Sequence, residues 1–243
     1  MNRPQANNKR ETATKIAIAV FLCVVVIELI FIAKVMDGTS FSLNGGGANT
    51  DYSSYRDLAQ ADESYFEWEE NTITALTEDG KVQTIIIIPA RCEKIEEGVF
   101  TNASLQYLFF EDDDDVDITG AFKEADDLIY AELPSGLTGI GDYAFWYCTS
   151  LLSITIPDGT VSIGDYAFQW CTSLSEVTFG EGLKYIGERT FWECSEIEGV
   201  TLPDSLKSIG NFAFYSGLET ADISSETETA EYSFPGSTAI SMR

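Results

Sequence analysis

The chain has 243 residues with 40 Asp and Glu, 14 Lys and Arg and no histidine, and its formal net charge is −26. So acidic a chain repels nucleic-acid phosphates, and we expect no nucleic-acid partner. Without histidine the commonest general base and metal ligand is missing, and neither a nucleophile elbow nor a phosphate-binding loop is present in the sequence. We therefore expect no enzyme and no firm metal site, although a hydrolase that uses only carboxylates stays open.

The first element is a run of mainly apolar residues at 16–36. About 21 residues are enough for a helix to cross a bilayer, and cleaved signal peptides usually have a shorter apolar stretch. Because residues 1–15 are rich in Lys and Arg, the positive-inside rule places them in the cytoplasm. The sequence therefore predicts a single-pass anchor that holds the rest of the chain outside the plasma membrane; a cleaved signal peptide is the alternative.

Glu28 lies inside this apolar run. An acidic residue near the centre of a membrane helix costs roughly 2.5 to 3.5 kcal/mol. Pairing of Glu28 with a second membrane helix would offset this cost, whereas the other interpretation is that the apolar flanks tolerate one acid.

Two segments precede the rest of the chain. Residues 37–64 are rich in Gly, Ser, Asn and Asp and predict a flexible linker, with a short amphipathic helix beginning near Tyr55. Residues 65–84 predict an N-terminal cap. There we expect a hairpin, with strands at Ile73–Leu76 and Val82–Ile88 around an Asp-Gly turn.

Residues 85–223 repeat with a period of 22 or 23 residues, a spacing set by Phe100, Phe122, Phe145, Phe168, Phe191 and Phe214. A period of this length indicates a solenoid, in which stacked coils share one core. Each repeat holds an L-x-x-I-x-I segment that predicts a short strand, and then a segment like I-G-D-Y-A-F that predicts a short helical or 3-10 piece. Residues 224–243 depart from the pattern and predict a degenerate cap and a tail.

Three cysteines follow the same period. Cys148, Cys171 and Cys194 each stand three residues after a repeat phenylalanine. Equivalent positions in stacked coils lie above one another, so we expect a ladder of buried thiols. The spacing does not fit a metal site, which would need CxxC-like pairs or histidines.

The stretch I-P-D-G-T-V-S-I-G-D-Y-A-F-Q-W-C-T-S-L, residues 156–174, resembles the BspA-type leucine-rich repeat, and the similarity extends over residues 85–223. The resemblance implies a leucine-rich-repeat solenoid with a parallel sheet on its concave face. It also implies a surface protein with a role in adhesion to matrix, cells or other microbes. Family members share scaffold residues, so the resemblance does not name a ligand.

Exposed aromatic residues are candidates for binding, because such surface suits protein or sugar rings. One group occupies strand positions expected to face outward on the concave sheet: Tyr107, Phe109, Ile129, Tyr130 and Leu152. A second group follows the repeat phenylalanines: Trp146, Tyr147, Trp170, Trp192 and Tyr215. The alternative for the second group is that its large side chains only pack against neighbouring coils.

An acidic run holds Asp112, Asp113, Asp114, Asp115 and Asp117. Carboxylates suit Ca²⁺, but calcium loops space their ligands and include glycine, so a solvated loop is the favoured interpretation. Together these patterns predict a non-catalytic cell-surface protein that binds an extracellular protein or glycan. The alternative is an accessory scaffold that assembles in the membrane through the helix that contains Glu28.

Overall fold

The computed structural model describes residues 52–243, and the predicted membrane segment 16–36 lies outside this range. Within the described range, none of the helices has the length and apolar character that a bilayer span requires. The described residues, 52–243, form one compact unit.

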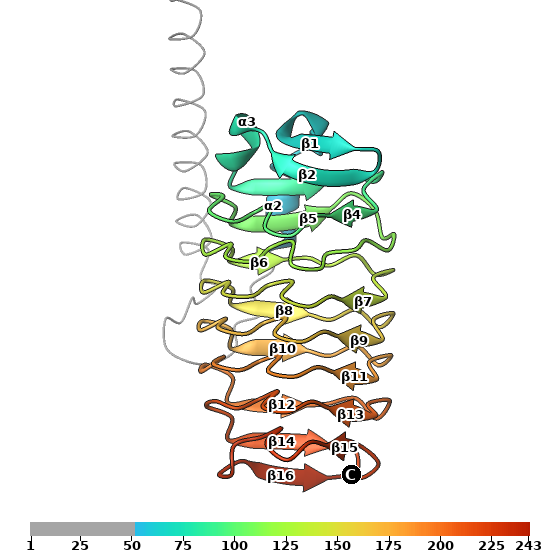
Figure 1. Ribbon diagram of the computed structural model, residues 1–243, viewed down its shortest axis with the longest axis vertical. Helices are drawn as coiled ribbons and strands as arrows, with labels where there is room; N and C mark the ends of the chain where they lie inside the picture. The colour runs from blue at the N-terminus through green and yellow to red at the C-terminus, as the bar shows by residue number, and fades with distance from the viewer. Residues whose placement is uncertain (1–51) are drawn as a thin grey trace, which may run out of the picture. The chain divides into compact units, whose positions relative to one another are not determined.

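The unit is a stack of coils, and each coil contributes a strand to a sheet on one side of the stack (Figure 1). The main sheet is parallel and contains β3 (Ile85–Ile88), β5 (Tyr107–Phe110), β6 (Tyr130–Ala131), β8 (Ser153–Thr155) and β10 (Glu176–Thr178). A separate C-terminal sheet, also parallel, contains β12 (Gly199–Thr201), β14 (Thr220–Ile223) and β16 (Ala239–Met242). These strands confirm the repeated strand that the sequence predicts.

A second parallel sheet runs along the other side of the stack (Figure 1). It consists of two-residue strands: β7 (Gly139–Ile140), β9 (Ser162–Ile163), β11 (Tyr185–Ile186), β13 (Ser208–Ile209) and β15 (Glu228–Thr229). The sequence did not predict these strands, because two residues are too few to show an alternating pattern.

The predicted helical or 3-10 piece of each coil is wrong, since turns follow the short strands instead. The reason lies in the backbone hydrogen bonds. The Tyr143 N–H donates to the Asp165 carbonyl at 3.0 Å, and the Phe145 N–H donates to the Ala167 carbonyl at 2.8 Å. Every second N–H therefore bonds to the next coil, and a helix would need those donors for itself.

The repeat phenylalanines form a stacked ladder through the core. All six are buried, and neighbouring rings lie 4.9 to 5.2 Å apart. Phe234 adds one more ring at 5.6 Å from Phe214. Stacked pairs of this kind contribute about 0.5 to 1.5 kcal/mol beyond the burial of their area. The ladder thus links consecutive coils and explains the fixed period.

The N-terminal cap differs from the predicted hairpin. The antiparallel pair is β1 (Phe66–Glu69) with β2 (Thr72–Leu76), and β2 also pairs in parallel with β4 (Lys94–Ile95). The segment predicted as the hairpin turn forms a short helix, α3 (Glu78–Lys81), whose first turn is capped by the Thr77 hydroxyl. A Cβ on Gly80 would lie 2.2 Å from the Tyr65 carbonyl oxygen. Gly80 is therefore needed for close packing of two segments and not for a hairpin turn.

Residues 52–64 belong to the folded unit, which shortens the predicted flexible linker. They contain α2 (Ser53–Arg56) and the beginning of the 3-10 turn η1 (Glu63–Tyr65). The expected amphipathic helix from Tyr55 is thus only the end of α2, because the chain turns away after Arg56 to follow the outer face of the main sheet.

Residues 224–243 form a further coil, where a degenerate cap and a tail were predicted. Strand β15 pairs with β13, and β16 pairs with β14 over four residues in register. The backbone pairing continues although the sequence pattern fades, because ladder hydrogen bonds involve the main chain alone.

Candidate functional site

Tyr107 and Phe109 lie on the outer face of β5, as predicted, but they are not exposed. Tyr107 is 8% exposed and Phe109 is 0% exposed, because residues 52–61 of the same chain cover them. Ile129 and Tyr130 are partly buried against the same cluster. The expectation of an open aromatic face is therefore wrong at this end of the main sheet.

Leu152 stands apart from that cluster. Its side chain is 40% exposed beside β8. On the strands that follow Leu152, β8 and β10, the outward positions of the main sheet hold small or polar residues such as Ser153, Thr155 and Thr178. This part of the sheet does not form an aromatic surface.

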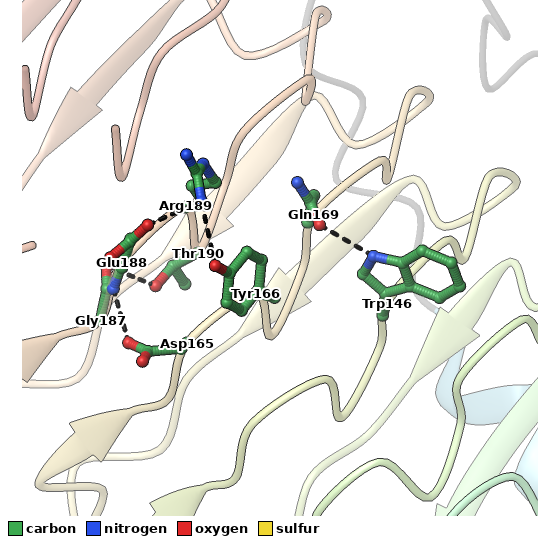
Figure 2. Close-up of polar contacts among 8 residues, drawn as sticks. All are labelled: Trp146, Asp165, Tyr166, Gln169, Gly187, Glu188, Arg189 and Thr190. Carbon is green, nitrogen blue, oxygen red and sulfur yellow. Dashed lines mark hydrogen bonds and ion pairs between the residues drawn. The ribbon is translucent and has the colours of Figure 1, made fainter. Parts of the chain in front are cut away.

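The predicted column after the repeat phenylalanines divides into two kinds of side chain. Trp146 and Trp192 are half-buried, and the Trp146 indole N–H donates to Gln169 Oε1 at 2.9 Å (Figure 2). The packing alternative therefore describes these two residues well. Tyr147, Trp170 and Tyr215 are exposed by 40%, 38% and 42% and remain available for contact.

A second row of large side chains lies beside this column, two residues before each core phenylalanine. We call it the aromatic ridge; its members are Tyr143, Tyr166, Arg189, Phe212 and the equivalent Tyr232. This row was not among the predicted binding residues. Its signal was the same 23-residue spacing, in the Tyr of the Y-A-F motif.

The ridge is continuous from coil to coil. The rings of Tyr143 and Tyr166 stack at 5.0 Å, and those of Phe212 and Tyr232 stack at 5.2 Å. Between these pairs lies Arg189, whose guanidinium carbon is 5.8 Å from the Tyr166 ring centroid and 5.2 Å from that of Phe212. Cation–π contacts of this kind contribute about 0.5 to 1 kcal/mol at exposed sites.

Polar contacts hold Arg189 in place (Figure 2). Its guanidinium donates to the Tyr166 hydroxyl at 3.0 Å and to Glu188 Oε1 at 2.7 Å. The backbone N–H of Glu188 in turn donates to Asp165 Oδ1 at 2.7 Å. Arg189 therefore stays in the row between the rings and its charge is largely matched by Glu188.

The backbone of four ridge residues is left-handed. Tyr143, Tyr166, Arg189 and Phe212 have φ between 50° and 59°, whereas the equivalent position in an earlier coil is Gly120 with φ 63°. A left-handed conformation costs a non-glycine residue roughly 1 to 2 kcal/mol. Glycine would avoid this cost, but Glu124 and Glu193 have the same conformation at a second turn position, so the turns of the coils impose it. At the ridge positions, stacking of the large side chains offsets part of the cost.

The repeats match one known protein family. The BspA type leucine rich repeat region matches residues 79–157 and 138–241, with six copies. This chain belongs to the BspA-type leucine-rich repeat family. The match reaches further at both ends than residues 85–223, and it agrees with the extra coil after residue 223.

Several solved structures resemble this BspA-type protein. A leucine-rich repeat protein of T. pallidum is 27% identical, with a TM-score of 0.48 and coverage of 68% of this chain and 71% of that one. A leucine rich cell surface protein of Faecalibacterium prausnitzii A2-165 is 19% identical, with a TM-score of 0.42 and coverage of 65% and 60%. Because both TM-scores are below 0.5, neither similarity bears on function. No curated protein matches the chain.

The acidic run of this BspA-type protein bonds to the neighbouring coil. Asp115 accepts hydrogen bonds from the Thr138 N–H at 2.9 Å and the Thr138 hydroxyl at 2.8 Å. Asp113 accepts from the Ser135 N–H at 3.1 Å, and Asp117 from a local N–H. Among the described residues no group of three or more acids or cysteines is placed to hold a metal ion. Asp113 and Asp115 thus act as acceptors between coils, whereas Asp117 caps a local turn.

The cysteine ladder is buried as predicted. The thiols of Cys148, Cys171 and Cys194 each donate to a carbonyl of the preceding coil at 3.1 Å. Burial raises the pKa of Cys148 and of Cys194 well above the usual value of a thiol. Such thiols are neutral and unreactive, so they stabilise the BspA-type core and supply no nucleophile.

Proposed function

We propose that this protein is a non-catalytic recognition protein of the cell surface that binds a protein partner through the aromatic ridge. One observation carries the proposal: large side chains form a continuous surface row across five coils, and four of them occupy left-handed backbone positions. Tyr143 and Tyr232, at its two ends, are 38% and 44% exposed. Membership of a leucine-rich repeat family supports a binding role, since solenoids present extended surfaces to partners.

The arrangement of the rings favours a protein partner. Within each stacked pair the planes are nearly parallel, at 3° for Tyr143 with Tyr166 and 8° for Phe212 with Tyr232. The faces between the rings are covered, so edges and hydroxyl groups remain for a partner. Tyr residues presented in this way are typical of protein interfaces, where one end is apolar and the other forms hydrogen bonds.

A glycan is the second candidate, and a different pair of side chains favours it. Tyr147 and Trp170 are both exposed, and their planes are tilted by 46° at 6.4 Å. Neither ring covers the face of the other. Open aromatic faces of this kind could stack on sugar rings.

The test is binding to arrays of matrix proteins and glycans, with single alanine variants. We expect Tyr143→Ala to weaken a protein hit by about 2 kcal/mol, which is roughly thirtyfold in Kd. Tyr185→Ala is the matched control, because Tyr185 is 50% exposed on β11 and lies outside the ridge. Equal affinities for the two variants would refute binding through the ridge. A glycan hit that is lost only with Trp170→Ala would favour the second candidate.

The proposal includes a membrane anchor at residues 16–36 with the repeats outside the cell. Its support is the apolar run and the basic residues that precede it. Protease treatment of intact cells should remove the repeats and leave a small membrane-bound fragment. Repeats that stay intact until the cells are lysed would contradict this orientation. The scaffold alternative rests on Glu28, which lies outside the described residues. If the protein is such a scaffold, Glu28→Leu should disrupt its assembly with other membrane helices; otherwise the variant should assemble and bind as the wild type does.

A further inference from the structure

An aromatic patch on the outer face of the main sheet is covered by the chain itself. The covered patch consists of Ile87, Tyr107, Phe109 and Tyr130, from strands β3, β5 and β6. These side chains form a cluster separate from the phenylalanine core, which lies on the other face of the same strands. The patch is therefore not required to fill the core.

The segment that covers it, residues 52–61, is here called the strap. Two of its tyrosines provide the aromatic contacts. The rings of Tyr55 and Tyr107 stack at 4.3 Å with an angle of 8°, and those of Tyr52 and Tyr130 lie 4.8 Å apart. Because Tyr52 and Tyr55 are three residues apart around the helical turn α2, they lie side by side toward the sheet.

One basic residue completes the contact. Arg56 Nη1 donates to Glu132 Oε1 at 2.9 Å, and Arg56 Nη2 donates to the Phe110 carbonyl at 2.7 Å. The site beside the patch thus supplies a carboxylate and a carbonyl to a cation. Together, the aromatic patch and this polar site complement a segment that has two aromatic rings followed by a basic residue.

Side chains of the strap make its contacts with the sheet. Its backbone N–H groups donate within the strap, as from Tyr55 to Tyr52 at 2.9 Å and from Leu58 to Tyr55 at 3.1 Å. A peptide that binds in a groove through one face of a helical turn makes contacts of this type.

We propose that the covered patch is a docking site for a protein segment that presents two aromatic rings one helical turn apart followed by a basic residue. The strap is the built-in competitor for this site. Being part of the same chain, it acts at an effective concentration on the order of millimolar. A partner must therefore displace it, and the patch stays closed until a strong competitor arrives.

The test uses the full chain in detergent and a labelled peptide of residues 50–61 as the probe. The released variant carries Tyr55→Ala and Arg56→Ala, which remove the ring stack and the ion pair. We expect the probe to bind this variant at least roughly tenfold more tightly than the wild type, because the competitor is weakened. Leu58→Ala is the matched control in the strap, since Leu58 is 50% exposed; it should behave as the wild type.

Two further measurements complete the test. Addition of Tyr107→Ala to the released variant should abolish probe binding, which places the probe on the patch. Trypsin should cut after Arg56 faster in Tyr55→Ala than in the wild type, while circular dichroism shows that both stay folded. Equal probe binding to wild type and released variant would overturn the proposal, as would no binding to the released variant. Unfolding of that variant would also overturn it, because the strap would then be part of the stabilising core. Binding through the aromatic ridge is independent of all these outcomes.

Discussion

Replacement of Phe168 by alanine tests whether the ring ladder holds the coils together. Phe168 is 0% exposed, and its ring stacks at 5.2 Å on both Phe145 and Phe191, with angles of 2° and 1°. A buried Phe→Ala change costs about 3 to 5 kcal/mol. Since two stacked pairs are lost, each contributing about 0.5 to 1.5 kcal/mol, we expect the upper part of that range. Phe234→Ala should cost only about 1 to 2 kcal/mol, because Phe234 is half-buried and stacks on Phe214 alone.

The contrast follows from the one-dimensional stack. In a solenoid each coil interacts only with its neighbours, so a central change weakens two interfaces and a terminal change weakens one. Urea unfolding, followed by circular dichroism and by tryptophan fluorescence, measures both free energies of unfolding. A cost for Phe168→Ala no larger than that for Phe234→Ala would refute the argument. The core would then be stabilised by burial of area alone, without a contribution from ring order.

Three other predictions concern single groups. Burial raises the pKa of Cys148 and of Cys194, so iodoacetamide should label neither thiol in the folded protein and both thiols in urea. Mass spectrometry detects the label, and labelling of the folded protein would contradict their burial. Asp115→Ala removes both bonds to Thr138 and should lower stability by about 1 kcal/mol. Thermal melts should show the same loss with and without calcium, whereas a calcium-dependent loss would indicate a metal site. Burial, and then the neighbouring Tyr55, raise the pKa of Tyr107 above its usual value near 10. The native phenol therefore keeps its proton where the unfolded one loses it, so its contribution to stability is complete below about pH 10 and declines above. Tyr107→Phe should lack this decline in urea midpoints measured across that range.

The coil architecture could be predicted from the sequence because each repeat contains its own core residues. The alternation in segments such as L-x-x-I-x-I predicts a strand without reference to any other coil, and β8 and β10 lie where it places them. The spacing of Cys148, Cys171 and Cys194 predicted the buried thiols for the same reason. A fixed period makes equivalent residues neighbours in space.

The sequence-based predictions of local structure are wrong where local patterns compete with contacts between distant segments. The Asp-Gly pair at residues 79–80 is typical of a hairpin turn, but the space beside Tyr65 decides what Gly80 does. The Y-A-F segments have the spacing of a helical turn, yet Tyr143 and Phe145 donate their backbone N–H groups to the next coil. In both cases the partner lies in another part of the chain, which a local pattern does not reveal.

The sequence by itself determined the period, the core and the family of this protein, because those depend on apolar residues repeated at short range. Only the tertiary structure decided which aromatic residues reach solvent. Tyr107 is buried because the strap, which lies some fifty residues earlier in the chain, packs on its face, and Tyr143 joins a ridge because Tyr166 stacks on it from the next coil. Exposure depends on which segments come together, and this is set by the packing of the whole stack.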